Sequence, residues 1–329
     1  MPTWSGILAE LQQAIAAGDP GAFDHVRRKY LALLHQHTRR DTILYATAWT
    51  QPGSDVPPAL LSITDEDLQG LMEVIHGLKG PALDLILHSP GGIPEAAEAI
   101  VSYLRSKFDH VRVIVPNMAM SAATMIACSA NVIAMGKHSF IGPIDPQVVL
   151  PGGRAAPAQA ILDQFDLAKD ECKRDSSALG AWVPMLGQYG PALLVQCKNA
   201  LKLSEELVSE WLERYMLAGQ TGAKARATDI AKKLCDHKTH KTHGRHIQRE
   251  QAKALGLVVE DLETDQAFQD LVLSVFHAST HTFGVGVYKI IENHSGKAFI
   301  KQLQRMVQTI PVPPSRLVPH HTLPPTGSP

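Results

Sequence analysis

Short apolar segments that alternate with helical patterns constrain the fold of this chain most strongly. The runs at 82–90 (ALDLILHSP), 111–116 (VRVIVP) and 131–136 (NVIAMG) have the length and composition of buried strands. Between them lie a helical pattern at 94–107 and a helix-like run of small residues that starts at Ser121. Buried strands separated by helices are typical of a largely parallel sheet covered on both faces. We therefore expect an α/β fold.

The remaining segments are expected to surround this β-α-β-α-β unit. The length of 329 residues allows one large domain with additions or two medium domains. We predict a helical segment at 1–40, a core domain at 41–262 that includes a helical insertion at about 157–236, a helical extension at 263–309, and a Pro-rich disordered tail at 310–329.

Charge and cysteine usage argue against several classes of protein. The 31 Lys and Arg residues nearly balance the 32 Asp and Glu residues, whereas proteins that coat nucleic acid usually show a basic excess or stripe. No run approaches the roughly 18 apolar residues of a transmembrane helix, and the N-terminus lacks the basic start of a signal peptide. The four cysteines form no CxxC pair. We expect no nucleic-acid partner, no membrane span and a cytoplasmic location.

Two turns that follow the predicted strands could carry chemistry. HSPGG (88–92) closes a buried strand, and its adjacent glycines permit backbone conformations that side chains forbid while exposing amide N–H groups. MAMSAAT (118–124) places Ser121 at the start of a helix, among small residues that would let a substrate backbone approach. Taken singly, the first is equally well an ordinary strand-to-helix turn and the second an N-cap serine.

Taken together, the two turns resemble a known superfamily. SPGG, AMSAAT one βα unit later, and then NVIAMGKHSFIGPIDPQ resemble the Clp protease and crotonase superfamily. Within it the chain is most similar to the serine dehydrogenase proteinase family, distant relatives of signal peptide peptidase A. The part that bears the motifs covers about residues 82–148. The resemblance implies a Clp/crotonase-type spiral of ββα units with helical additions at the N- and C-termini.

The resemblance also implies a serine protease that works through an acyl-enzyme. Ser121 would be the nucleophile, and the backbone amides of Gly91, Gly92 and Ala122 would form the oxyanion hole. Donors fixed in the backbone stabilise a developing oxyanion without reorganisation, commonly by ~3–4 kcal/mol each. This chemistry needs no metal or cofactor. Because proteins of this superfamily usually assemble, we expect a homo-oligomer that acts on a peptide or protein substrate.

The chain departs from its relatives at the general base. In the Clp proteolytic subunit the catalytic histidine follows the strand after the serine, where this chain has Asp145. The catalytic acid of that subunit falls where this chain has His243, so the two residue types have exchanged places. In the signal-peptide-peptidase relatives a lysine is the base, and Gln159 occupies its position here.

Three hypotheses for the base follow. Ser121, His243 and Asp145 could form a triad of unusual chain order, because a triad is defined by geometry and roles rather than by sequence order. Alternatively, Lys169 or Lys173 could serve after burial lowers its pKa. In the third hypothesis the site has no base, and the protein is a Clp-like scaffold or binding protein regulated by a partner.

Particular residues bear on two further kinds of site. Acyl-CoA chemistry of the crotonase type is disfavoured, because no paired glutamates accompany the glycines of residues 88–92. The histidine-rich segment 237–246 (HKTHKTHGRH) could bind zinc if it were helical. Gly244 and the intervening Lys and Thr residues instead favour an irregular loop with solvated histidines.

Overall fold

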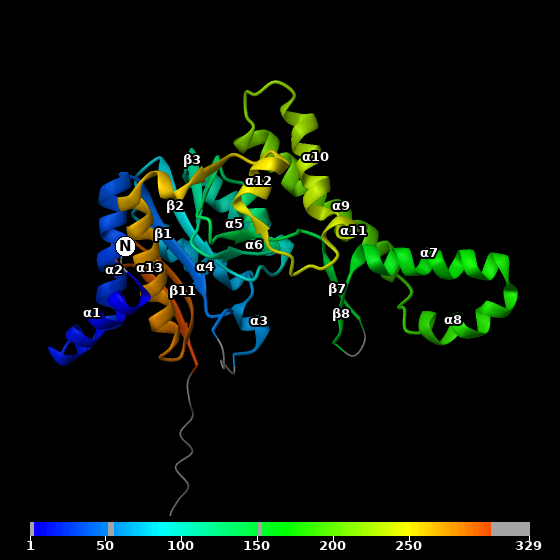
Figure 1. Cartoon of the computed structure of the whole chain (residues 1–329), viewed down its shortest axis with the longest axis horizontal. Helices are drawn as coiled ribbons and strands as arrows, with labels where there is room; N and C mark the ends of the chain where they lie inside the picture. The colour runs from blue at the N-terminus through cyan, green and yellow to red at the C-terminus, as the bar shows by residue number, and fades with distance from the viewer. Residues whose placement is uncertain (1–2, 52–55, 151–152, 304–329) are drawn as a thin grey trace, which may run out of the picture.

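The protein is built on a central seven-stranded sheet (Figure 1). A computed structural model describes residues 3–51, 56–150 and 153–303. The strand order is β10-β5-β3-β2-β1-β11-β12, in which β10 to β1 run parallel and β11 and β12 are antiparallel to their neighbours. The strands are β1 (Asp41–Thr47), β2 (Ala82–His88), β3 (His110–Val115), β5 (Val132–Met135), β10 (Val259–Asp261), β11 (Val287–Asn293) and β12 (Ala298–Gln302).

Two smaller sheets lie beside the central one. A three-stranded sheet has the order β4-β6-β9, with β4 (Met118–Ala119), β6 (Phe140–Ile141) and β9 (Ile247–Gln248). A hairpin pairs β7 (Gln147–Val149) with β8 (Ala155–Pro157).

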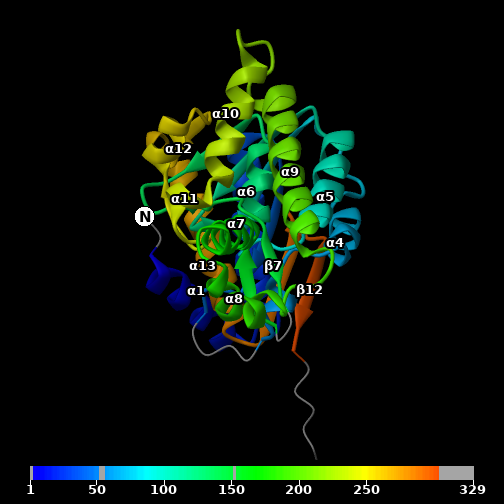
Figure 2. The ribbon, with the colours of Figure 1, turned by 90° about the vertical axis from the view of Figure 1, so that its right-hand side faces the viewer.

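Helices cover both faces of the central sheet. On one side lie α2, α13 and α1, and on the other α4, α5, α6 and α9 (Figures 1 and 2). The helical segments are α1 (Trp4–Ala16), α2 (Ala22–Thr38), α3 (Pro58–Leu61), α4 (Glu66–Ile75), α5 (Pro94–Lys107), α6 (Ala122–Cys128), α7 (Ala158–Arg174), η1 (Ser176–Ala178), α8 (Leu179–Leu186), α9 (Leu193–Trp211), η2 (Leu212–Met216), α10 (Ala223–Cys235), α11 (His237–His240), α12 (Arg249–Leu255), η3 (Leu262–Thr264) and α13 (Gln266–Phe283).

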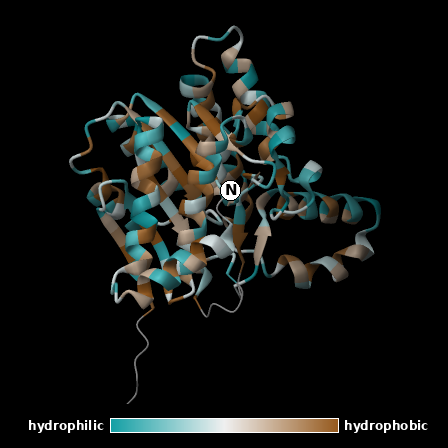
Figure 3. Cartoon of the chain, turned by 60° about the vertical axis from the view of Figure 1, so that its left-hand side comes forward, coloured by the Kyte–Doolittle hydropathy of each residue, from teal (hydrophilic) through white to brown (hydrophobic). Residues whose placement is uncertain are grey.

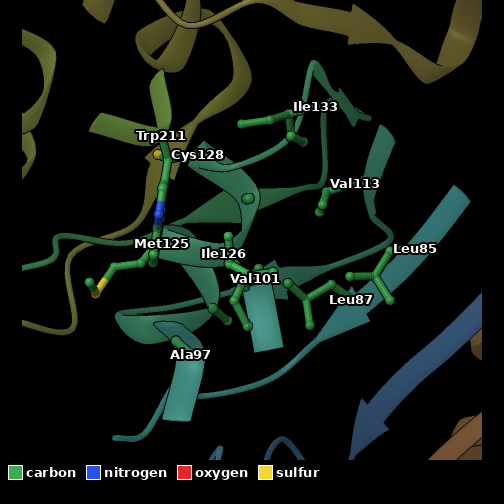
Figure 4. Packing of buried hydrophobic residues seen from close by; sticks show 14 of the residues in the cluster. Leu85, Leu87, Ala97, Val101, Val113, Met125, Ile126, Cys128, Ile133 and Trp211 are labelled. Atoms are coloured by element: carbon green, nitrogen blue, oxygen red, sulfur yellow. The ribbon is translucent and has the colours of Figure 1, made fainter. Parts of the chain in front are cut away.

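The alternation of side chains along the strands explains the two cores. Ile43 and Tyr45 of β1 pack into the cluster under α4, α5 and α6, whereas Leu44 and Ala46 pack toward α2 and α13. Figure 4 shows the first cluster around Met125, and Figure 3 shows the apolar strands enclosed by helices whose outer faces are more hydrophilic. Both faces of the sheet are therefore buried, which confirms the α/β fold expected from the sequence.

The helix predicted at 94–107 is present with the same bounds. Pro94 occupies its first turn, where a missing N–H costs no hydrogen bond, and Arg105 and Lys107 lie in its last turn near the negative end of the helix dipole. Arg105 also donates from Nη1 to Asn131 Oδ1 over 2.8 Å, which ties this helix to the segment that leads into β5.

The C-terminal part of the chain differs from its prediction. Residues 263–309 were expected to be a helical extension, but α13 ends at Phe283 and the chain then returns as the hairpin β11–β12. β11 pairs with β1 and lengthens the central sheet. The β-branched and aromatic residues of VYKIIEN and the turn at Gly296 favour strands here. The predicted disordered tail at 310–329 lies outside the described residues.

A buried ion cluster anchors this hairpin to α2. Glu292 of β11 and Arg27 of α2 both have fully buried side chains, and Arg27 Nε donates to Glu292 Oε2 over 2.5 Å. Arg28 Nε donates to the other carboxylate oxygen, also over 2.5 Å. The two cations compensate one buried carboxylate and thereby fix α2 against the sheet.

Across the ranges given above, none of the helices combines the length and the apolar character that crossing a bilayer requires.

Replacing Glu292 with Gln should destabilise the protein strongly, because the buried Arg27 then keeps only the partly exposed carboxylate of Asp24 as an ionic partner. We expect a loss of about 3–5 kcal/mol in the free energy of unfolding, measured by urea titration. The control is Glu206→Gln, which removes an exposed partner of Lys202 and should change stability by less than about 0.5 kcal/mol. Equal effects of the two substitutions would contradict the anchoring role.

Candidate active site

The three-stranded sheet β4-β6-β9 gathers the predicted site residues. β4 and β6 pair in parallel, with Ala119 opposite Ile141, and β9 pairs antiparallel to β6, with Ile247 opposite Ile141. Ser121 lies just after β4, Asp145 shortly after β6, and His243 shortly before β9. Residues that are far apart in the sequence thus reach one end of a small sheet.

Ser121 has the backbone of a strained turn. Its φ is 53° and its ψ is −121°, a region that residues other than glycine rarely adopt. The residue precedes α6, yet its hydroxyl makes no capping hydrogen bond, and the side chain is half-buried. A strand-turn-helix that exposes a serine hydroxyl in this way is typical of nucleophilic serines.

Thr124 connects the serine turn to the segment that carries Asp145. Its hydroxyl donates to the carbonyl of Ala119 over 2.8 Å and accepts the N–H of Gly142 over 2.9 Å. Gly142 also lies against Met120, where a Cβ would meet the methionine Cε at 2.6 Å. The turn before α6 and the loop after β6 are therefore held in contact.

The glycine turn lies directly against Ser121. Ser89 donates its N–H to the carbonyl of Met118 over 3.1 Å and accepts the N–H of Met120 over 3.0 Å, so the turn pairs with β4. Gly91 has a φ of +96°, and a Cβ there would lie 2.6 Å from Ser121 Cβ and 2.8 Å from the nitrogen of Ala122. Only glycine allows this approach.

The three backbone amides predicted for the oxyanion hole differ in their bonding. The N–H of Gly91 donates to the hydroxyl of Ser89 over 3.2 Å. Gly92 packs on the backbone of Ile63, and its own N–H has no acceptor within the part of the chain that the structure describes. Ala122 is the first residue of α6, a position whose N–H has no partner inside the helix. Gly92 and Ala122 thus supply the two free donors.

Asp145 is almost fully buried and has several donors. The Asp145 residue is 1% exposed, and its Oδ1 lies 2.7 Å from Nδ1 of His243. Its Oδ2 lies 3.2 Å from Nδ1 of His237 and 3.1 Å from the amide nitrogen of Gln147. Because a carboxylate only accepts, each Nδ1 carries the proton, which leaves both Nε2 atoms unprotonated in the neutral rings. Either imidazole could therefore act as a base.

The predicted Asp145–His243 pair is present, but its link to the nucleophile is not. Among the residues described, no hydrogen bond joins the Ser121 hydroxyl to His243 or to His237. The structure therefore brings the acid and the imidazole together and holds the serine in the turn that follows the adjoining strand β4.

The two lysines proposed as bases lie on α7 and are exposed. The side chains of Lys169 and Lys173 are 54% and 66% exposed, and their Nζ atoms lie 3.8 Å from Asp166 and 3.9 Å from Asp170. The burial that the lysine hypothesis requires is absent. Gln159, at the lysine position of the relatives, lines the same pocket as His237 and donates to Asp163 over 2.8 Å.

Sequence reasoning missed His237, which it had placed in a solvated loop. The segment is instead a short helix, α11, followed by a turn. Along it, His240 is buried with Nε2 2.8 Å from the carbonyl of Lys233, and the His246 ring contacts that of Phe140. The three-residue spacing of the histidines could have indicated a helical turn here, because residues three apart lie on the same side of a helix.

Three buried titratable groups of the core are held neutral. Burial lowers the pKa of His88 to about 3, and its Nδ1 lies 3.4 Å from the Met118 nitrogen. Burial raises the pKa of Cys128 to about 12, and burial with nearby carboxylates raises that of Cys235 to about 12. These thiols are therefore poor nucleophiles near neutral pH.

One group of side chains at the N-terminal end of β1 has the residue types of a metal site. Potential ligand atoms of His35, Asp41 and His294 lie within 4.8 Å of one another. The two imidazoles stack with centroids 3.7 Å apart, and the Thr42 N–H donates to His294 Nδ1 over 3.1 Å. His294 Nε2 lies 3.8 Å from Asp41 Oδ1, too far for a hydrogen bond, and one nitrogen of each ring is bonded to the backbone, that of His35 to the Arg40 carbonyl and that of His294 to the Thr42 N–H.

Similar proteins were found by sequence and by structure. The chain is 30% identical over 204 residues to the uncharacterized protein MJ0137 of Methanocaldococcus jannaschii, covering 62% of each chain. It is 31% identical over 204 residues to MJ1495 of the same organism, covering 61% of this chain and 60% of the relative. The chain thus spans less than two thirds of the length of these relatives.

Two solved structures are similar at low identity. One is a serine-to-alanine mutant of the 1510-N membrane-bound stomatin-specific protease, with 18% identity, a TM-score of 0.36, and coverage of 60% of this chain and 75% of that chain. The other is a lysine-to-alanine mutant of the same protease in complex with a substrate peptide, with 17% identity, a TM-score of 0.37, and coverage of 60% and 71%.

The model of one protein family matches residues 59–274, which include every predicted site residue. That family is described as ClpP-like SDH-type serine proteinase. The match agrees with the resemblance seen in the sequence motifs, and the chain belongs to this family.

Proposed function

We propose that the protein hydrolyses peptide bonds through an acyl-enzyme on Ser121. The observation that carries the proposal is the convergence, at one end of the sheet β4-β6-β9, of a strained serine, the glycine turn that lies against it and a buried Asp145–His243 pair. Membership of a serine peptidase family supports the same reaction class.

In the proposed mechanism Ser121 Oγ attacks the carbonyl carbon of the scissile peptide bond. His243 takes the serine proton at Nε2, while Asp145 holds the protonated Nδ1 and stabilises the imidazolium. The amides of Ala122 and Gly92 donate to the oxyanion, and His243 then returns the proton to the leaving amine. A water molecule releases the acyl group by the same steps. Substrate binding must bring Nε2 within hydrogen-bond reach of the serine hydroxyl.

The alternative is a scaffold that keeps the fold without the reaction. Two observations favour it: in the described residues the Ser121 hydroxyl lacks a bonded base, and the Gly91 amide is bonded to Ser89. The reactivity of Ser121 distinguishes the two functions. The expected homo-oligomer remains a prediction, so the reactivity is measured on the full chain in its native assembly.

A fluorophosphonate should form a single covalent adduct with the wild-type protein, detected by intact mass. Ser121→Ala should abolish it, because the attacking oxygen is removed. Ser129→Ala is the control, since Ser129 is buried at the other end of α6, and it should label like the wild type. Absence of any adduct in the folded wild-type protein would favour the scaffold.

Substitution of the base should separate the three hypotheses. We expect His243→Ala to slow fluorophosphonate labelling at least 100-fold, because general-base catalysis typically contributes about 10²–10⁴-fold. Lys169→Ala should leave the rate unchanged. His246→Ala, which removes a ring that packs on Phe140, is the matched histidine control. If Lys169→Ala slowed labelling strongly and His243→Ala did not, the general base would be the lysine.

The close approach of the glycine turn gives a steric test. Gly91→Ala would push a methyl group into Ser121 Cβ and the Ala122 nitrogen, so we expect labelling to fall by about 100-fold, comparable to loss of an oxyanion donor. Gly77→Ala is the control: Gly77 has a similar φ of +92°, but a Cβ there meets no atom within 4 Å. If both variants lost reactivity equally, backbone strain rather than contact with the serine would be the cause.

A further inference from the structure

The glycine turn has a second neighbour besides β4, which is the segment 62–64 between α3 and α4. The N–H of Ile63 donates to the carbonyl of Gly91 over 2.7 Å, and the Ile63 carbonyl accepts the N–H of Ile93 over 3.0 Å. Ile63 is fully buried and forms a parallel bridge with Gly92, where a Cβ would lie 2.3 Å from the Ile63 oxygen. The position of Ile63 therefore constrains the position of the turn.

A buried ion pair bonds to the backbone before and after Ile63. Lys289 of β11 donates from Nζ to the carbonyl of Ser62 over 2.9 Å, and the N–H of Thr64 donates to Asp67 Oδ2 over 2.9 Å. The Lys289 Nζ lies 2.7 Å from Oδ1 and 2.9 Å from Oδ2 of Asp67. The two side chains are 5% and 1% exposed, so both charges of the pair are removed from water.

The same two peptide groups bond to the ion pair and to the glycine turn. In a trans peptide the C=O and the N–H point in opposite directions within one plane, and the described chain has no cis peptide. In the peptide that joins residues 62 and 63, the C=O accepts from Lys289 and the N–H bonds to Gly91. In the next peptide, the N–H bonds to Asp67 and the C=O accepts from Ile93. The ion pair therefore orients the two planes that hold the turn.

The carboxylate of Asp67 has a further donor in Tyr45 of β1. The tyrosine hydroxyl donates to Oδ2 over 2.8 Å, and burial together with the Asp67 carboxylate raises the pKa of Tyr45 well above its usual value. Asp67 also lies in the first turn of α4, where the helix dipole favours a negative charge. The carboxylate is thus fixed from β1, from β11 and from its own helix.

Stability alone does not account for a pair of this kind. The desolvation of two buried charges can exceed their mutual attraction, and well-packed apolar side chains of similar volume often stabilise a core equally well. Apolar side chains cannot, however, form directional hydrogen bonds with a backbone carbonyl and a backbone N–H. The particular contribution of Lys289 and Asp67 is therefore the orientation of the backbone at residues 62–64.

We propose that Lys289 and Asp67 are positioning residues of the peptidase reaction. Their ion pair orients the peptide groups on both sides of Ile63 and thereby holds the glycine turn against Ser121. The inference rests on the proposed function, because it concerns the turn that would bind the oxyanion. In this role neither side chain contacts the substrate.

The test replaces both charges at once, Lys289→Met together with Asp67→Asn, so that no buried charge loses its partner. Asn keeps an acceptor for the Thr64 N–H, whereas the Ser62 carbonyl loses its donor. We expect fluorophosphonate labelling of Ser121 to slow by roughly tenfold to hundredfold, because a misplacement of about 1 Å can reduce a rate by about 10²-fold. The rate is measured by intact mass on the full chain in its native assembly.

The phosphorus NMR signal of the adduct distinguishes positioning from general destabilisation. The phosphonyl oxygen on Ser121 lies where the oxyanion would develop, so its hydrogen bonds to backbone amides influence the phosphorus chemical shift. The folded wild-type adduct should differ in this shift from the same adduct unfolded in urea. The adduct of the double variant, still folded, should have a shift closer to the unfolded value.

Two control variants perturb the surroundings without touching the segment 62–64. Tyr45→Phe removes one hydrogen bond to the Asp67 carboxylate and keeps the aromatic ring, whose centroid lies 5.9 Å from Lys289 Nζ. Glu292→Gln destabilises the protein through the cluster with Arg27. Below their unfolding transitions, both should keep the wild-type labelling rate and phosphorus shift.

A second double variant is used if the first does not fold. Lys289→Gln with Asp67→Asn keeps a polar contact between the two side chains, while the shorter Gln withdraws from the Ser62 carbonyl. It is also expected to lower the labelling rate and to change the phosphorus shift.

The outcomes separate this inference from the proposed function. A folded wild-type chain that is not labelled would refute the proposed function, and the positioning role with it. A labelled wild-type chain with a double variant of unchanged rate and unchanged phosphorus shift would overturn the positioning role alone. Equal losses in the double variant and in Glu292→Gln would also overturn it, because the cause would then be general destabilisation.

Discussion

Backbone hydrogen bonds on the two sides of the short strand β4 support the rest of the site. On one side Ser89 pairs with Ala119 and brings the glycine turn against Ser121. On the other side β6 pairs with β4 and delivers the segment that leads to Asp145. Because β4 has only two residues, both pairings lie within a few residues of Ser121. The strained φ of Ser121 is thus held from outside the residue itself, as a costly backbone conformation requires.

The buried carboxylate of Asp145 imposes the second condition. An ionised carboxylate that is removed from water must be surrounded by donors, and here they come from two imidazoles and one amide. Both histidines belong to the segment between α10 and β9. Their contacts with the Asp145 carboxylate therefore hold that segment in place. The exchange of His and Asp relative to the Clp proteolytic subunit is therefore consistent with the same contact made in reverse order along the chain.

Local patterns were sufficient for the parallel core. The apolar runs at 82–90 and 111–116 became adjacent parallel strands, and Pro94 marked the start of the helix between them, because burial on both faces and fixed proline geometry act locally. The C-terminal hairpin was missed, since its strands are stabilised by pairing with β1, far away in the sequence. The link between His237 and Asp145 was missed for the same reason: the residues are distant in sequence, and nothing local marks the contact.

The sequence by itself determined the α/β class, the family, the serine turn and the glycine turn, because each follows from short-range sterics or from a contiguous motif. Only the tertiary structure decided which side chains reach the buried carboxylate and that the lysines of α7 stay in solvent. These outcomes depend on the packing of separate segments, and the free energy of a long-range contact is not encoded in either segment alone.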